Sequence, residues 1–221
     1  MTSNTSKGKT RSAFYAFARG LLVLLSPLLF PLRFHNIENL NAPTAPYMLV
    51  ANHTSLLDPL VLAIALKRYQ IHFLGKTELN AGGLFSFFLK GLHMISVSRH
   101  ATDIAAIRAC NTVLKNGDVL GLFPEGTRNK PENFMNGVES GLSMIALRNK
   151  VPVIPAYIHI KVRFFRRTHV YFFPPIPYDD LLSKGVGKDS VDELTRRFVR
   201  VMREARDTAF KELGRKNQKT R

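Results

Sequence analysis

The chain has 221 residues, enough for one domain with a full hydrophobic core, and its 45% content of hydrophobic residues excludes a disordered chain. It carries 32 Lys and Arg residues against 16 Asp and Glu residues. The resulting net charge of +16 favours an anionic partner: nucleic acid, an anionic membrane surface or a phosphorylated substrate. The single cysteine, Cys110, excludes an internal disulfide and a multi-thiolate metal site, and we expect it to be a small core residue of a helix.

The N-terminus changes from a polar, basic tip over residues 1–11 to an almost wholly apolar segment over residues 13–34. A signal peptide, a buried helix, a membrane span and a helix lying in one leaflet are the competing interpretations. No small-residue cleavage site follows the segment, and Arg19, Pro27 and Pro31 interrupt it as a span. A narrow polar stripe is formed on a helix by residues that recur every seven positions, Ser12, Arg19, Ser26 and Arg33. This pattern favours an interfacial or re-entrant helix, so we predict that residues 1–35 form a membrane-associated unit.

Residues 36–221 alternate between short apolar runs typical of strands and longer segments typical of helices. The strands are predicted at residues 47–51, 71–75, 93–98, 119–123, 151–160 and 170–173. The helices between them are predicted at residues 59–67, 78–90, 103–115 and 137–148. This alternation predicts an α/β fold, in which a single domain has a mostly parallel mixed sheet covered by helices.

The last predicted element is a long amphipathic helix that begins near Ser190 and ends at Gly214. Ser190 and Glu193 have the spacing of a capping box, and glycine commonly follows the end of a helix. The apolar face comprises Val191, Leu194, Phe198, Val201, Ala205 and Leu213, and the other face carries Arg196, Arg197, Arg200, Arg203 and Arg206. We expect a surface helix packed on the core. The alternative is that its arginines contact anionic lipid head groups or an acidic carrier protein.

A candidate catalytic pair, His53 and Asp58, lies where the strand over residues 47–51 passes into a helix. On one continuous helix, residues five apart point about 140° away from each other, so the pair meets only if the backbone turns between them. Pro59 favours that turn, because proline prefers the first position of a helix and aspartate is a preferred N-cap. Both side chains would then lie at one end of the sheet, where α/β enzymes usually place their chemistry.

Other predicted strands also end in polar residues, namely Lys76, Arg99 and the run Glu125, Gly126, Thr127 and Arg128. Gly126 lets the backbone approach a ligand closely, and Arg128 offers a planar fork suited to phosphate. Each residue alone has an ordinary structural explanation, but in a parallel sheet all of these strand ends share one edge. They would form a site for a phosphorylated substrate and acid–base chemistry. No second histidine or carboxylate stands at ligand spacing from His53, so we expect no metal.

Four motifs occur in order along the chain: Asn-His-Thr-Ser-Leu-Leu-Asp at 52–58, Ser-Val-Ser-Arg at 96–99, Phe-Pro-Glu-Gly-Thr-Arg at 123–128 and Val-Pro-Val-Ile-Pro at 151–155. Together they resemble the glycerolipid acyltransferase family, which includes bacterial 1-acylglycerol-3-phosphate acyltransferases. The basic and then apolar N-terminus is similar to the membrane-associated start of bacterial members. Two positions depart from the family pattern, since Asn129 stands where serine is frequent and residues 134–137 lack a lysine.

The resemblance implies that His53 is a general base, which takes the proton from a substrate hydroxyl as this attacks an acyl thioester. Asp58 would orient the imidazole and stabilise its charged form. Backbone N–H groups around Gly126 would stabilise the tetrahedral oxyanion, and neither an acyl-enzyme nor a cofactor is needed. Substrate contacts, above all with the phosphate, would come from Lys76, Arg99, Glu125, Gly126, Thr127 and Arg128.

The predicted reaction moves a fatty acyl group from acyl-carrier protein (ACP) or CoA to 1-acylglycerol-3-phosphate, also called lysophosphatidic acid. The product is phosphatidic acid, an intermediate of phospholipid biosynthesis. Another lysolipid or an aminolipid is the alternative acceptor. A basic membrane- or nucleic-acid-binding module without activity is the alternative of a different class, although no nucleic-acid-binding motif is found and no nucleic-acid partner is expected. We expect an anionic phospholipid membrane as the partner and the cytoplasmic face of the inner membrane as the location.

Overall fold

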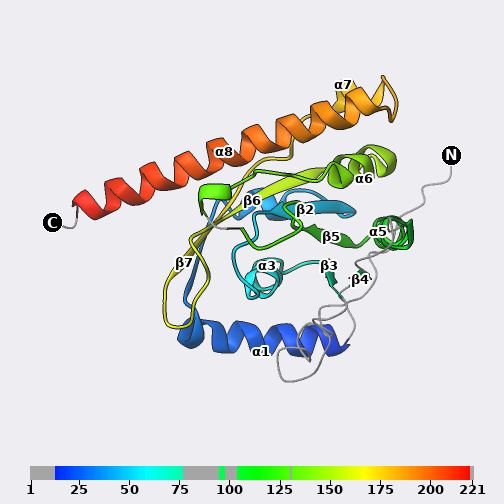
Figure 1. The fold of residues 1–221 in the computed structure, drawn as a ribbon. Helices are drawn as coiled ribbons and strands as arrows, with labels where there is room; N and C mark the ends of the chain where they lie inside the picture. The colour runs from blue at the N-terminus through cyan, green and yellow to red at the C-terminus, as the bar shows by residue number, and fades with distance from the viewer. Residues whose placement is uncertain (1–12, 77–94, 98–103, 130, 220–221) are drawn as a thin grey trace.

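The structure is a computed structural model that describes residues 13–76, 95–97, 104–129 and 131–219 (Figure 1). The helices are α1 (Ala13–Leu29), α2 (Glu38–Asn41), α3 (Asp58–Ala65), α5 (Ile104–Lys115), α6 (Gly141–Asn149), α7 (Asp179–Leu182), α8 (Lys188–Lys219) and the short 3₁₀ helix η2 (Pro131–Asn133). The strands are β1 (Leu32–His35), β2 (Tyr47–Ala51), β3 (Ile71–Lys76), β4 (Ile95–Val97), β5 (Val119–Leu122), β6 (Val153–His159) and β7 (Thr168–Phe172).

The strands form one seven-stranded sheet in the order β1-β7-β6-β2-β5-β3-β4. Five neighbouring strands, from β6 to β4, are mutually parallel, whereas β7 runs antiparallel to β6 and β1 runs parallel to β7. The predicted α/β fold with a mostly parallel mixed sheet is therefore confirmed. The edge strand β1 was not predicted, and the helix predicted at residues 78–90 lies outside the described residues.

Helices cover both faces of the sheet (Figure 1). Helices α1 and α3 contribute to one hydrophobic cluster, and α5, α6 and α8 contribute to a second. All five residues of β2 are buried because the strand lies in the middle of the sheet with helices on either side. Cys110 packs in the second cluster, as its place in a helix predicts.

Helix α1 packs on α3 with Arg19 and Ser26 of the predicted polar stripe facing the protein, whereas Arg33 is an exposed residue of β1 and Ser12 lies outside the described residues. Ser26 is buried beside the apolar contacts of this face, and the Arg19 guanidinium donates hydrogen bonds to the carbonyl oxygens of Ala63, Ile64 and Leu66 at 2.7–3.1 Å. These carbonyls belong to the last turn of α3, where a helix has no partners of its own and favours a positive charge. No helix within the described residues is both long and apolar enough to cross a membrane.

Helix α8 packs on the core as predicted, but its two predicted ends are wrong. It begins at Lys188, so Ser190 lies within the first turn and is buried instead of capping the helix. It also continues through Gly214 to Lys219, since a single glycine costs a helix only about 1 kcal/mol. Arg197 fixes the N-terminal part of α8 to α7 through a bidentate pair with Asp180 at 2.7 Å.

Candidate active site

The turn between β2 and α3 brings His53 and Asp58 into direct contact. The Nδ1 atom of His53 lies 2.9 Å from Oδ2 of Asp58, a carboxylate with no exposure to solvent. The same oxygen accepts hydrogen bonds from the backbone N–H groups of Thr54 at 2.6 Å and Ser55 at 2.7 Å. Asp58 is the first residue of α3, and its carboxylate points back to the turn instead of capping the helix. It therefore holds both the turn and the imidazole.

These contacts determine which nitrogen of His53 can act as a base. An ionised carboxylate can only accept hydrogen bonds, so Nδ1 carries the proton and Nε2 keeps its lone pair. Nε2 has no partner among the residues that the structure describes. The ring stacks on Phe123 with a centroid distance of 4.3 Å, and Phe123 stacks on Phe73 at 5.7 Å. The imidazole is thus held from two sides, while 18% of the side chain stays exposed.

Glu125 has a different position from the one predicted for a phosphate contact. Its buried carboxylate accepts a hydrogen bond from the backbone N–H of His53 at 2.8 Å and another from that of Met135 at 3.0 Å. A carboxylate also repels a phosphate. Because the backbone N–H of Asn129 donates to the His53 carbonyl at 2.9 Å, the loop after β5 braces the catalytic turn at two points.

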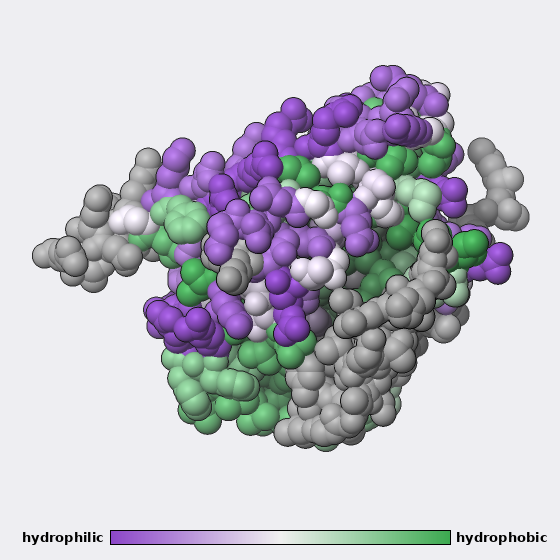
Figure 2. Space-filling model, viewed as in Figure 1, coloured by the Kyte–Doolittle hydropathy of each residue, from purple (hydrophilic) through white to green (hydrophobic). Residues whose placement is uncertain are grey.

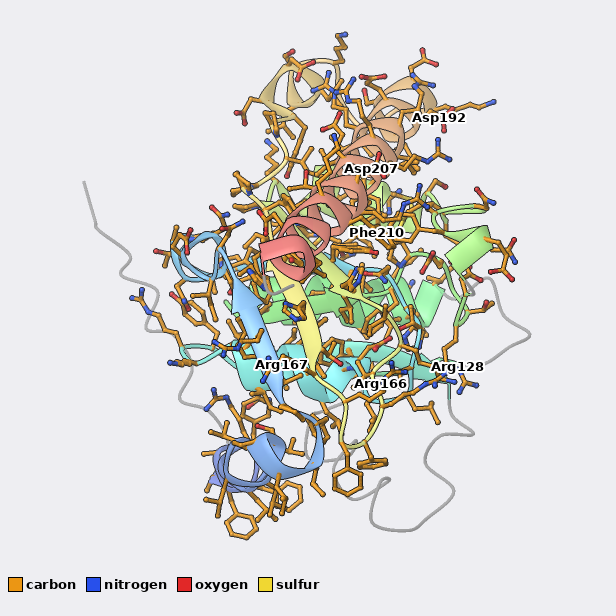
Figure 3. The ribbon with its side chains drawn as sticks, turned by 90° about the vertical axis from the view of Figure 1, so that its left-hand side faces the viewer. Arg128, Arg166, Arg167, Asp192, Asp207 and Phe210 are labelled. Atoms are coloured by element: carbon orange, nitrogen blue, oxygen red, sulfur yellow. The ribbon has the colours of Figure 1, made fainter. Side chains whose placement is uncertain are left out.

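The next residues of the loop after β5 are Gly126, Thr127 and Arg128, and they differ in how strongly the structure constrains them. Gly126 has a φ of 64°, a left-handed conformation that favours glycine, and a side chain there would displace the Glu139 carboxylate. Its N–H donates to the Phe123 carbonyl, so the neighbouring N–H groups around Gly126 stay the predicted donors to the oxyanion. Thr127 donates a hydrogen bond to the Asn129 side chain. Arg128 is exposed, and in Figure 3 it lies on the same side of the molecule as Arg166, Arg167 and α1.

Lys76 ends strand β3 at the same edge of the sheet as the His53 turn. Strands β3 and β2 both run parallel to β5, so their carboxyl ends lie together. The side chain of Lys76 and the whole of Arg99 lie outside the described parts of the structure. Their predicted contacts with substrate phosphate therefore stay predictions.

Two further residues of this edge were not identified as functional from the sequence. The buried Asn52 side chain exchanges two hydrogen bonds with the backbone of Ile158, at 3.0 and 2.8 Å, and so fixes the end of β2 to β6. Phe123 provides the surface on which the His53 ring stacks. Both lie inside the recognised motifs, where their position next to His53 and Glu125 was the available signal.

The family model described as Acyltransferase matches residues 31–159. The chain belongs to the acyltransferase family. The match contains His53, Asp58 and the loop after β5, and it confirms the resemblance predicted from the four motifs. Within this family, a 1-acyl-sn-glycerol-3-phosphate acyltransferase of Bacillus subtilis is 30% identical over 142 residues, which are 64% of this chain and 69% of that protein.

Another acyltransferase, the 1-acyl-sn-glycerol-3-phosphate acyltransferase of Streptococcus pneumoniae, is 32% identical over 144 residues, which cover 64% of this chain and 53% of that protein. The chain thus spans only about half the length of this relative. The crystal structure of the 1-acyl-sn-glycerophosphate acyltransferase PlsC from Thermotoga maritima matches with a TM-score of 0.63 at 20% identity, over 88% of this chain and 78% of that one. This likeness shows that the two proteins share the fold.

Proposed function

We propose that this protein transfers a fatty acyl group from a thioester to the free hydroxyl of 1-acylglycerol-3-phosphate, giving phosphatidic acid. The observation that carries the proposal is the pair in which Asp58 holds Nδ1 of His53 at 2.9 Å and leaves Nε2 available. The relatives named as 1-acyl-sn-glycerol-3-phosphate acyltransferases support the choice of acceptor.

In the proposed reaction, Nε2 of His53 takes the hydroxyl proton of the acceptor as its oxygen attacks the thioester carbonyl. Asp58 stabilises the imidazolium that forms. The tetrahedral intermediate then expels the thiolate, which recovers the proton from Nε2, so that an ester and a free thiol are the products. Cys110 does not serve as a nucleophile, because it is buried and burial raises the pKa of its thiol to about 12.

The oxyanion of the intermediate needs donors close to His53. The backbone N–H groups of Thr127 and Arg128 are the candidates, because neither donates a hydrogen bond to any residue that the structure describes. Each well-placed donor of this kind contributes about 2.7–4 kcal/mol in other enzymes. The exposed Arg128 guanidinium would bind the acceptor phosphate, and Lys76 and Arg99 are expected to assist it.

An ACP or CoA thioester is the proposed acyl donor. Exposed arginines of α8 line a groove of about 590 Å³ against Met135, Gly137 and Val138, and Glu125 holds this segment through the N–H of Met135. Arg200 and Arg203 have no ion-pair partner among the described residues, so they remain available to an acidic carrier or a phosphate. Glu204 and Asp207 also line the groove and reduce its positive charge.

The acceptor is a lipid, and the outer face of α1 supports a membrane location. Three large apolar residues of this helix, Phe17, Leu24 and Leu28, are 64–75% exposed. Figure 2 shows hydrophobic residues gathered along this edge of the molecule, with a hydrophilic band beside them. We infer that α1 lies in one leaflet with this face in the lipid, on the cytoplasmic side of the inner membrane.

The test is an assay of the purified protein with lysophosphatidic acid, other lysolipids and an aminolipid, each offered with acyl-ACP and with acyl-CoA. We expect phosphatidic acid from the wild type and none from His53→Ala. The matched control is His72→Ala, because His72 also pairs with an aspartate, Asp118, at 3.3 Å, but at the opposite edge of the sheet. Turnover that survives in His53→Ala would refute the proposal. Preference for another lysolipid would change the acceptor and leave the mechanism intact.

A further inference from the structure

The loop between β6 and β7, residues 160–167, exposes large hydrophobic side chains. Phe164 is 54% exposed and Phe165 is 74% exposed, although the rest of the sheet's aromatic residues are largely covered. Single exposed hydrophobic residues are common, but two adjacent phenylalanines beside a further exposed apolar surface indicate an interaction site.

This loop is attached to the C-terminal end of α1. The backbone N–H of Phe165 donates to the carbonyl of Leu29 at 2.6 Å, and that of Thr168 donates to the carbonyl of Pro31 at 3.0 Å. The Phe164 ring contacts the Phe30 ring with a centroid distance of 6.3 Å. The exposed phenylalanines are therefore held next to the C-terminal end of α1, whose outer face also exposes large apolar residues.

The same loop is also attached to the catalytic turn. The Ser55 hydroxyl donates a hydrogen bond to the carbonyl of Val162 at 3.2 Å, and Val162 is buried. Ser55 in turn donates its N–H to Asp58. The position of the loop relative to His53 is thus fixed through contacts within the protein.

The backbone of the loop is strained in the conformation that exposes these rings. Phe165 has a φ of 59° and Ile160 has a φ of 60°, a left-handed conformation that bulky residues rarely adopt. Such strain persists only where the surroundings determine it, and it is concentrated at functional positions. Here the N–H of the strained Phe165 is bonded to the Leu29 carbonyl, while its ring is exposed to solvent.

The charges of the loop indicate what covers it. Residues 160–167 contain four exposed basic residues, Lys161, Arg163, Arg166 and Arg167, and no acidic residue. Figure 3 places Arg166 and Arg167 on the side of the molecule where α1 lies, away from α8. Phenylalanines flanked by arginines suit a bilayer surface, where rings enter the acyl region and guanidinium groups bind anionic head groups.

We propose that the 160–167 loop is a second membrane contact, which inserts Phe164 and Phe165 into an anionic phospholipid leaflet beside α1. Its two attachments would set the orientation of the enzyme, so that the entrance to His53 lies at the lipid surface where the acceptor resides. This role in orienting the enzyme rests on the proposed lipid acceptor, but binding of the protein to a membrane is measurable without any substrate.

The test measures binding of the full chain to phosphatidylglycerol and to phosphatidylcholine vesicles by co-sedimentation. Phe165→Asn removes the ring and keeps a residue that tolerates positive φ. We expect it to weaken binding to phosphatidylglycerol about tenfold, the factor for withdrawing one partly inserted ring from lipid. The matched control is Phe210→Ala on α8, because Phe210 is 55% exposed on the other face of the sheet and should not affect binding.

A charge variant tests the head-group contact separately. Replacing Arg163, Arg166 and Arg167 together by glutamine should weaken binding to phosphatidylglycerol on the order of a hundredfold at low salt. Binding to phosphatidylcholine should change little.

Wild-type binding by Phe165→Asn would overturn the proposal. It would also be overturned if light scattering without lipid showed a dimer that this variant converts to a monomer, because the loop would then bind a second copy of the chain. Failure of the proposed function is distinguishable from both outcomes, since His53→Ala should bind vesicles as the wild type does.

Discussion

Replacing Asp58 by asparagine tests the catalytic pair most directly. The carboxylate is fully buried, and a single oxygen accepts from Nδ1 of His53 and from the backbone N–H groups of Thr54 and Ser55. Asparagine has nearly the same shape and keeps one accepting oxygen, so the turn can persist. What disappears is the negative charge next to the imidazolium that forms during acyl transfer.

The expected size of this effect follows from the geometry. Opposite unit charges about 4 Å apart attract by about 4 kcal/mol at an effective dielectric constant of about 20. Losing that attraction in the transition state lowers kcat by about a thousandfold. The two backbone hydrogen bonds also lose a charged acceptor at about 1 kcal/mol each, so the free energy of unfolding should fall by about 2 kcal/mol.

The assay combines kcat with the free energy of unfolding from urea denaturation of the same preparation. Ser55→Ala is the matched control, because it removes the hydroxyl that bonds Val162 and Leu57 in the same turn without touching His53. It should cost about 1–3 kcal/mol of stability and leave kcat within a few-fold. If Asp58→Asn loses stability but keeps turnover comparable with this control, Asp58 serves only to hold the turn.

Three further substitutions test the phosphate contact, the attachment of α1 to α3 and the effect of a buried histidine on the pH dependence of stability. Arg128→Lys should raise the KM for lysophosphatidic acid about tenfold with little change in kcat, because lysine lacks the planar fork; an effect on the donor's KM alone would contradict this role. Arg19→Met should lower the free energy of unfolding by about 2–3 kcal/mol, since α3 loses its charged partner, and denaturation measures it. Burial lowers the pKa of His159, whose Nδ1 is buried with no partner among the described residues. The folded protein therefore binds fewer protons than the unfolded chain, and stability should fall as the pH drops below about 6.5. His159→Phe should flatten this dependence in denaturation at several pH values, and an unchanged slope would refute it.

The sequence predicted the elements whose residues are all buried or follow one regular pattern of burial. Strand β2 was predicted with its observed bounds, because burial on both faces makes it a continuous apolar run. Strand β1 was missed because it is a half-exposed edge strand that mixes charged and apolar residues. Its partner β7 comes more than a hundred residues later, and no local pattern reveals such a pairing.

In the candidate site, too, contacts within one local segment could be predicted from the sequence, whereas contacts between distant segments could not. The contact between His53 and Asp58 follows from a local turn, which Pro59 and the end of the apolar strand predict. The position of Glu125 depends instead on the backbone N–H groups of His53 and Met135, of which the first is 72 residues away. A glutamate three residues before an arginine in a loop at a strand end resembles a substrate ligand in sequence, because the sequence does not show where its hydrogen-bond partners are.

For helix α1, the sequence pattern predicted a polar face correctly but did not show what that face contacts. The seven-residue recurrence of Arg19 and Ser26 does define one polar face, but periodicity cannot say whether that face meets water, head groups or protein. The open carbonyls at the end of α3 decide it, since they bind Arg19 and turn Phe17, Leu24 and Leu28 outward. An apolar face presented in this way requires no refolding to enter a leaflet. Arg19 and Ser26 therefore attach α1 to the enzyme, and the proposed membrane contact would be made by the opposite side of the helix.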